Sequence, residues 1–346
     1  MTQPTVVISL DLELSWGSFD LSFDDNVRKM ARWTHDVGAP RLLNHLTRNG
    51  LSATWAVVGA MMRPSLPDVS ALPEVHYSHF SKPWFSYVPK QGDESTYPEW
   101  FGARLVDMIR NAKPEQEIGF HSFSHAPFGL PGMTRERAVA EYRYCAQIAR
   151  ELEIPTTSFV FPRNLVAYLR ELRDAGFVCF RDADELPVRF ASDSLTSLCA
   201  IWADFVGQSP RVVEPTLKEG LVAIPGSLLI RYEAGWRKYI PDASRLRRLR
   251  KGLERVRRGG GVLHVWFHPE NLYAEWPRLE NVVARFFEEV GESVCNGDMR
   301  CLTMGQLAGE FLKKLAAKQD SLSPAYAPSA YADCLTARSE LGAHLD

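Results

Sequence analysis

Short apolar runs alternate with amphipathic segments along most of this chain. The runs that predict strands are Thr5–Leu14, Ala53–Gly59, Ile118–Phe120, Thr157–Phe161, Phe177–Arg181, Leu221–Ile230 and Val262–Phe267. Helices are expected over Arg41–Asn49, Tyr97–Asn111, Thr134–Leu152, Asn164–Ala175, Arg278–Val290 and Leu302–Leu315. Strands that alternate with helices in this way build βαβ units, so the pattern predicts an α/β fold with a parallel sheet.

The size and composition of the chain narrow this prediction. A length of 346 residues suits one or two domains, or a single large α/β barrel. The formal net charge of −2 gives no global field that would favour nucleic acid as a partner. The N-terminus leads directly into a strand with no signal peptide, and the six cysteines form no CxxC pair. We therefore expect a cytoplasmic protein with reduced thiols.

The chain divides into two parts, and the first contains an insertion. Residues 1–315 are expected to form one barrel domain, and residues 316–346, rich in Ser, Pro, Ala and Tyr, a C-terminal extension. Residues 63–98 have no clear period and many aromatic side chains, which indicates a loop insertion near the strand ends. These aromatics either stack on a sugar ring or form a small hydrophobic core under the loop.

Acidic and imidazole side chains follow two of the predicted strands. Asp11 and Glu13 share one face of the first strand, because side chains alternate across a strand, and two such carboxylates need a positive partner. His121 and His125 stand four residues apart, which would place both imidazoles on one face of a helical turn. Together they suit Zn²⁺ or another divalent transition metal, although two surface histidines would show the same spacing.

Two further strands end in groups that can do chemistry. Arg163 follows the fourth strand, and His268 follows the last strand of the set, with His264 four residues upstream on the same face. Functional groups gather at the carboxyl ends of parallel strands in an α/β barrel, because the loops open there.

The acidic pair, the His-x-x-x-His, the Pro-Arg and the late strand histidine occur in an order that resembles the polysaccharide deacetylases of the NodB-homology type, carbohydrate esterase family 4. The resemblance spans roughly Val6 to Leu272. It implies a distorted (β/α)₇ barrel that binds one divalent metal, usually zinc, and hydrolyses N-acyl, sometimes O-acyl, groups on sugars. Similar family members act in O-antigen and capsule assembly.

The resemblance also implies a role for each motif residue. Asp11 corresponds to the general base, and Arg163 to the arginine that orients it. His268 corresponds to the general acid, and Asp182 to the aspartate that tunes it. The metal ligands would be Glu13, His121 and His125.

The sequence departs from the family pattern in three places. The acidic pair is Asp11-Leu12-Glu13 where two adjacent aspartates are usual, and the arginine motif is Phe-Pro-Arg-Asn. The late motif is His-Pro-Glu-Asn, and His264 is an alternative general acid.

The segment Arg237–Arg258 is strongly basic, with ten Lys and Arg residues against Asp242 and Glu254. Leucines and a valine recur at helical spacing, so a helix with a solvated basic face is the simplest interpretation. A patch for a phosphate-bearing substrate, or a peripheral contact with a membrane surface, is the sharper one.

The sequence thus predicts a metal-dependent N-deacylase acting on a small-molecule or lipid-linked acylated sugar in surface-polysaccharide biosynthesis. Three protein ligands would leave an open metal position for water. The alternatives are a non-sugar amide hydrolase of the same fold, and a non-catalytic sugar- or phosphate-binding barrel.

Overall fold

The computed structural model describes residues 3–184, 193–231, 235–273 and 278–321. One compact unit comprises Met1–Ala308, and Gly309–Asp346 form a second unit. Because the described residues end at 321, most of the predicted extension 316–346 lies outside them. Within the described ranges, every helix is too short or too polar to cross a bilayer.

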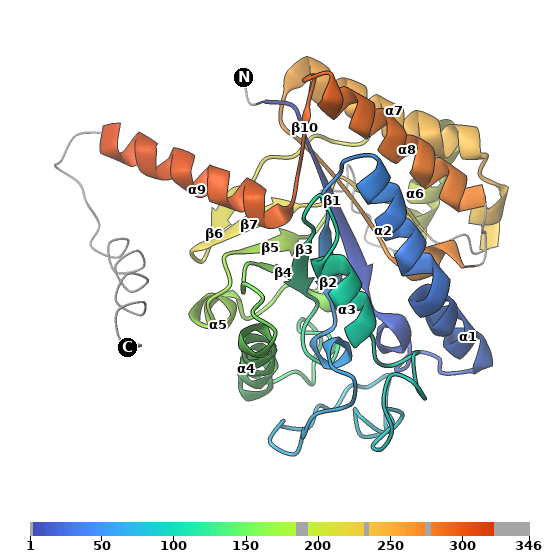
Figure 1. Ribbon diagram of the computed structural model, residues 1–346, viewed down its shortest axis with the longest axis vertical. Coiled ribbons are helices and arrows are strands. Elements are labelled where there is room, and N and C mark those ends of the chain that lie inside the picture. The colour runs from blue at the N-terminus through green and yellow to red at the C-terminus, as the bar shows by residue number, and fades with distance from the viewer. Residues whose placement is uncertain (1–2, 185–192, 232–234, 274–277, 322–346) are drawn as a thin grey trace. The chain divides into compact units, whose positions relative to one another are not determined.

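One curled sheet forms the centre of the first unit (Figure 1). Its strands are β1 (Thr5–Leu12), β2 (Thr54–Val57), β3 (Glu117–Phe120), β4 (Ser158–Val160), β5 (Cys179–Asp182), β6 (Thr216–Lys218), β7 (Leu221–Pro225), β8 (Leu228–Leu229), β9 (Val262–Phe267) and β10 (Arg300–Leu302). Their order is β6-β7-β5-β4-β3-β2-β1-β9-β8, and β10 also pairs with β1. The pairs from β7 through β1 to β8 are parallel, and the β6–β7 pair is antiparallel.

Two consecutive strands lie near opposite edges of the sheet: β7 is next to the edge strand β6, and β8 is the other edge strand. The predicted strand Leu221–Ile230 is two strands, β7 and β8, separated by Gly226 and Ser227. β8 pairs with β9, and the Ser227 backbone N–H donates to the His264 carbonyl at 2.9 Å. The sheet thus curls into the distorted (β/α) barrel that the alternation of strands and helices predicted.

Helices flank this sheet. They are α1 (Asp25–Trp33), α2 (Ala39–Arg48), α3 (Ala103–Arg110), α4 (Arg135–Glu151), α5 (Leu169–Asp174), α6 (Asp193–Val206), α7 (Asp242–Gly259) and α8 (Arg278–Cys295). A further helix, α9 (Met304–Ser321), begins in the first unit and continues into the second. α3 and α5 are shorter than the sequence predicted, and α9 is longer. α5 cannot begin at Asn164 because Arg163 and Asn164 both have positive φ, 57° and 53°.

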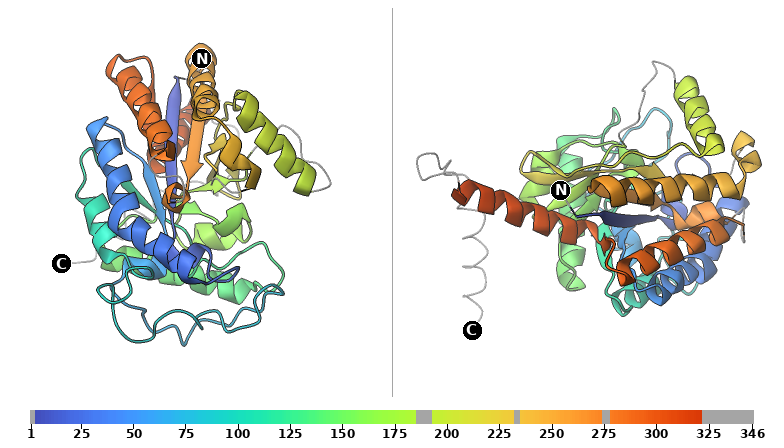
Figure 2. Two further views of the ribbon diagram at one scale, coloured as in Figure 1. Left: turned by 90° about the vertical axis from the view of Figure 1, so that its right-hand side faces the viewer. Right: turned by 90° about the horizontal axis from the view of Figure 1, so that it is seen from above.

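Polar caps and apolar stripes explain where several helices form. The Asp24 carboxylate accepts the backbone N–H groups of Asn26 and Val27 at the start of α1, and Thr134 Oγ1 accepts that of Arg137 at the start of α4. The predicted apolar stripe of α7 is buried, and consists of Leu246, Leu249, Leu253 and Val256. α7 and α8 lie next to each other (Figure 2).

The insertion 63–98 gathers beyond the end toward which β1 points (Figure 1). Its aromatic side chains form a small core: Trp84 is fully buried, and its ring meets Phe19 edge-on at 4.9 Å between centroids. Trp84 Nε1 donates to the Ser124 carbonyl at 2.9 Å, and the Tyr77 hydroxyl donates to the Pro127 carbonyl at 2.9 Å. The insertion therefore braces the segment that carries the histidine pair.

Candidate metal centre and catalytic site

Glu13 lies between the two imidazoles of the histidine pair. Its Oε1 is 2.8 Å from His121 Nε2 and 3.2 Å from His125 Nε2, and the two imidazole centroids are 5.0 Å apart. All three side chains are buried. Burial by itself raises the pKa of Glu13, but His268, His125 and His121 together hold that pKa well below its usual range.

The donor set suits a cation. His121 Nδ1 lies 2.8 Å from the Val160 carbonyl, which can only accept, so Nδ1 carries the hydrogen. In the neutral ring, Nε2 then directs a lone pair at the Glu13 carboxylate, an arrangement that is repulsive without a proton or metal ion between them. Metal-ligating histidines commonly donate the other ring N–H to a carbonyl. Two imidazole nitrogens and one carboxylate oxygen thus fit zinc or a similar divalent ion.

The histidine pair reaches this position from a loop. β3 ends at Phe120, and Ser122 and His125 have φ of 56° and 58°, so the segment is not the helical turn that the spacing suggested. The buried Glu141 carboxylate holds this loop, accepting the backbone N–H groups of Phe123 and Ser124 at 2.9 Å each.

Arg137 completes the support of the histidine loop. This buried guanidinium pairs with Glu141 at 2.7 Å and donates to Ser124 Oγ at 3.0 Å. It also donates to the Pro73 carbonyl at 2.5 Å, which ties the insertion to the same network. The loop conformation therefore depends on one buried ion pair rather than on helical hydrogen bonds.

Gly17 makes room for the Glu13 carboxylate. A Cβ at this position would lie 1.9 Å from Glu13 Oε2 and 2.9 Å from its Cδ. No side chain larger than hydrogen can occupy position 17 while Glu13 keeps its orientation toward the histidines.

Asp11 forms a buried bidentate pair with Arg181. Arg181 Nη1 donates to Oδ1 at 2.7 Å, and Nη2 donates to Oδ2 at 2.6 Å. Burial opposes ionisation, but Arg181 outweighs it and lowers the pKa of Asp11. Asp11 is therefore a carboxylate at neutral pH, oriented by an arginine, as a general base requires.

The arginine on Asp11 is not the one that the sequence predicted. The Arg163 guanidinium binds the buried Asp20 carboxylate instead, with Nη2 at 2.7 and 2.6 Å from its two oxygens. His79 Nε2 also contacts Asp20, at 2.9 Å. The positive φ at Arg163 turns the chain after β4, whereas Arg181, inside β5, points toward Asp11.

Two residues that the sequence did not mark hold Arg181 in place. The Asn164 side-chain carbonyl accepts from Arg181 Nε at 3.2 Å and Nη2 at 3.0 Å. The Trp266 ring stacks on the guanidinium at 3.9 Å, and its Nε1 donates to Asp184 at 2.8 Å. The sequence did contain one signal, because Arg181 lies inside the predicted fifth strand. A buried arginine there needs an acidic partner, and Asp11 could have been proposed.

His268 lies at the opening of the site, with 26% of its side chain exposed. Its Nε2 is 3.4 Å from Glu13 Oε1 and 3.7 Å from Asp11 Oδ2. Asn271 Nδ2 lies 3.4 Å from Nδ1. Burial acts to lower the pKa of His268, but Glu13 and Asp11 outweigh it and raise the pKa to about 9.

Asp182, the predicted partner of His268, has other contacts. Its Oδ2 accepts from Lys218, and its Oδ1 accepts the backbone N–H of Ala183 at 2.9 Å. The carboxylates close to His268 are instead Asp11 and Glu13.

His264, the alternative acid, is fully buried behind Asp11. Its Nε2 contacts Ser9 Oγ at 2.8 Å and its Nδ1 the Pro225 carbonyl at 3.1 Å. Burial, reinforced by Arg181, lowers the pKa of His264 to about 3. A neutral ring with both nitrogens engaged cannot supply a proton at neutral pH, which favours His268.

A second set of donors, Asp11, Glu13 and His268, also lies close enough to hold an ion. Both oxygens of Asp11 already accept from Arg181, which offsets its charge. The set with two imidazoles is therefore the better metal centre, and Asp11 and His268 remain beside it.

No protein-family model matches this sequence, and no curated protein is similar enough in sequence to be matched to it. Solved structures do match. A putative polysaccharide deacetylase from Mycobacterium smegmatis has a TM-score of 0.61 at 16% identity, over 91% of this chain and 92% of that one. A probable polysaccharide deacetylase from Pseudomonas aeruginosa PAO1 has a TM-score of 0.57 at 10% identity, over 90% and 92%.

An allantoinase shares the same architecture, with a TM-score of 0.56 at 10% identity, over 88% of this chain and 89% of that one. Similarity at this level of identity establishes architecture and leaves the reaction open. From the curled parallel sheet and these neighbours, we conclude that this chain has the fold that these polysaccharide deacetylases and the allantoinase share.

Proposed function

We propose that this chain is a metal-dependent hydrolase that removes an N-acyl group, acetyl or formyl, from a sugar. One arrangement carries the proposal: the buried Glu13, His121 and His125 form a divalent-ion site directly beside Asp11 and His268. The polysaccharide deacetylases that share the fold support a sugar as the substrate class.

Asp11 is the proposed general base. Bound at Glu13, His121 and His125, a zinc ion would polarise the acyl carbonyl and lower the pKa of a water molecule. Each Asp11 oxygen keeps a second lone pair beyond its bond to Arg181, so the carboxylate can accept a proton from the attacking water. Arg181 and Asn164 fix the direction of that carboxylate.

His268 is the proposed general acid. An amide nitrogen leaves only after it is protonated, because an amine anion is too basic a leaving group. Asn271 lies beside Nδ1, which leaves Nε2 to carry a hydrogen toward the two carboxylates and the opening of the site. The same histidine can therefore reach both the buried centre and an entering sugar.

A substrate panel tests the function. N-acetylated and N-formylated hexosamines, as free sugars, sugar phosphates and nucleotide sugars, are incubated with the zinc-loaded protein, and released acetate or formate is measured. We expect release from at least one member, and about one zinc per chain. Asp11→Asn and His268→Ala should keep zinc and lose activity by about 10²–10⁴-fold. Failure of every member of the panel would exclude sugar deacylation.

A non-sugar amide hydrolase is the second candidate, because an allantoinase has nearly the same structural similarity as the deacetylases. Allantoin and related ureides belong in the same panel. Hydrolysis of these compounds, with none of any acylated sugar, would select this candidate. A chain that binds no zinc would instead be a non-catalytic sugar- or phosphate-binding barrel.

We further propose a role in surface-polysaccharide biosynthesis, of the O-antigen or capsule kind, at the cytoplasmic face of a membrane. The support is the basic segment Arg237–Arg258, whose cations Arg247 and Lys251 are exposed. On the neighbouring α6, Trp202 and Phe205 are 61% and 55% exposed. α6 packs against α7, and basic and apolar side chains on adjacent helices suit an anionic lipid surface.

A further inference from the structure

Several arginines converge on a narrow pocket between α7 and the segment that follows β8. We call this the arginine pocket; it is lined by Arg231, Arg237, Arg245, Arg248, Asp204, Leu228, Leu229, Ile230, Ile240, Leu249 and Val282. Its volume of about 30 Å³ is room for two or three water-sized groups. That space admits a small polar group and is too small for a nucleotide.

Arg231 and Arg248 face the same carboxylate in the arginine pocket. Arg248 pairs with Asp204, and Arg231 reaches the same carboxylate at 3.8 Å. Only 15% of the Arg248 side chain and 20% of the Arg231 side chain are exposed. Among the described residues, buried Arg248 Nε has no hydrogen-bond partner. Two largely buried guanidinium groups thus share the Asp204 carboxylate, and Arg248 Nε has no acceptor in the described part of the chain.

The pKa values of the two arginines reflect their burial. Burial lowers the pKa of Arg248 to about 10 and lowers that of Arg231 as well. Asp184 acts against burial at both arginines, and it is the same carboxylate that accepts from Trp266 beside Arg181. Asp184 thus lies close both to the arginine pocket and to the Trp266 ring that stacks on Arg181.

Backbone contacts place the arginine pocket next to His268. Ile230, which lines it, donates its N–H to the Trp266 carbonyl at 3.0 Å. The Ile230 carbonyl lies 3.4 Å from Asn271 Nδ2, and the same amide lies 3.4 Å from His268 Nδ1. Arg231 thus follows a residue that is one side chain away from the proposed general acid.

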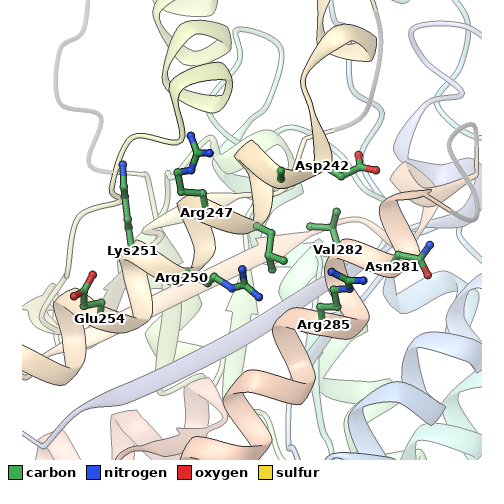
Figure 3. A pocket seen from close by; sticks show the side chains of 10 residues that line it. Asp242, Arg247, Arg250, Lys251, Glu254, Asn281, Val282 and Arg285 are labelled. Atoms are coloured by element: carbon green, nitrogen blue, oxygen red, sulfur yellow. The ribbon is translucent and has the colours of Figure 1, made fainter.

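A larger groove on the other side of α7 also contains arginines (Figure 3). It has a volume of about 540 Å³, and it is lined by Asp242, Ala243, Leu246, Arg247, Arg250, Lys251, Glu254, Asn281, Val282 and Arg285. Arg250 already pairs with Glu289 at 2.5 Å, and Arg247 is exposed to water, so these charges need no further anion. The buried arginines of the smaller pocket do.

We propose that the arginine pocket binds a phosphoryl group of the substrate, so that the acylated sugar is presented as a phosphate ester. This inference rests on the proposed deacylase function, because the adjacent His268 is where the leaving amine would lie. Sugar 1-phosphates, nucleotide sugars and lipid-linked sugars share this chemistry. The pocket accounts for binding of the phosphoryl group, and steady-state kinetics with each of these substrates distinguish its source.

Direct binding is the first test, and it does not depend on turnover. Inorganic phosphate is titrated into the protein, with binding followed by calorimetry, and Arg248→Gln should weaken it at least tenfold. Asp204→Asn should tighten it, because the competing carboxylate is lost while both arginines remain. Arg247→Gln, the exposed neighbour on the same helix, is the matched control and should change nothing. Equal losses of phosphate affinity in Arg247→Gln and Arg248→Gln would overturn the proposal. Unchanged phosphate affinity in every variant would mean adventitious binding elsewhere and would also overturn it.

Kinetics provide the second test. For a sugar 1-phosphate, kcat/KM should fall at least tenfold in Arg231→Gln, mostly through KM, while kcat/KM for the neutral acylated sugar stays the same. A nucleotide sugar and a lipid-linked sugar in detergent are tested in the same assay. The one whose kcat/KM exceeds that of the sugar 1-phosphate identifies the carrier. Phosphate binding without hydrolysis of any sugar would refute the deacylase and keep the pocket. Equal loss on neutral and phosphorylated sugars would refute the pocket and keep the deacylase.

Discussion

At the scale of single residues, the site depends on closely packed side chains that fix one another's orientation. Glu13 reaches both histidines because position 17 has no Cβ, and Asp11 is directed by a guanidinium held on one side by Asn164 and stacked on the other by Trp266. Each of these contacts can be changed one atom group at a time.

Gly17→Ala should displace the Glu13 carboxylate, because its Cβ would overlap Oε2. We expect zinc affinity to fall by about 10–100-fold, the range for a disturbed ligand environment. Chelator competition measures the affinity, and circular dichroism checks the fold. Gly259→Ala, where a Cβ would meet nothing within 4 Å, is the matched control. Unchanged zinc affinity in Gly17→Ala would show that Glu13 is not a ligand.

Arg181→Lys should lower kcat while zinc content stays the same, because lysine cannot make the two parallel bonds to Asp11. We expect a loss of about 10²-fold or more, as for a misdirected general base. Arg163→Gln separates the two arginines: its partner is Asp20, so it should affect kcat much less. A larger loss from Arg163→Gln than from Arg181→Lys would restore the sequence-based assignment.

At the scale of secondary-structure elements, α6 and α7 present a surface that the catalytic site does not use. α7 carries exposed cations, and the adjacent α6 carries exposed apolar residues. Lys251 of α7 donates to the Gly207 carbonyl just after α6 at 2.8 Å. The membrane contact proposed for Arg237–Arg258 belongs to this surface.

We expect the protein to sediment with vesicles that contain phosphatidylglycerol and to remain in solution with phosphatidylcholine alone, because the attraction is electrostatic. Raising the salt concentration should release it. The double variant Trp202→Ser/Phe205→Ser should bind more weakly, and Leu217→Ser, at an exposed position of β6, is the control. Equal binding to both kinds of vesicle would contradict an electrostatic membrane contact.

At the scale of the whole molecule, buried titratable groups link the stability of the fold to pH. His264 is fully buried, and its pKa is lowered to about 3 by burial and by Arg181. An unfolded histidine binds a proton below a pH of about 6.5. Between these two values the unfolded chain holds the extra proton, so the stability that neutral His264 contributes is complete above pH 6.5 and decreases as the pH falls.

Denaturant unfolding at several pH values measures this loss. His264 should contribute a slope of at most about 1.4 kcal/mol per pH unit between pH 6.5 and 3. In His264→Gln, which keeps a side chain that can bond Ser9, the part of the slope due to His264 should disappear. Identical pH profiles for the two proteins would mean that His264 is protonated in the folded state.

Local sequence determined the parts of this protein that depend on near neighbours. Runs such as Val6-Val7-Ile8 and the leucine spacing of α7 predicted buried elements correctly, because periodicity and propensity act over a few residues. The order of the motifs predicted the barrel. It also predicted that one group of side chains would meet at one end of it, and these are Asp11, Glu13, His121, His125 and His268.

Tertiary structure decided which side chains meet. Whether Arg163 or Arg181 reaches Asp11 depends on the turn after β4 and on the neighbouring strand, 170 residues from Asp11 along the chain. The arginine pocket likewise combines α6, the segment after β8 and α7. Burial and pairing across such distances set the charge balance of a site, and no local pattern in the sequence records them.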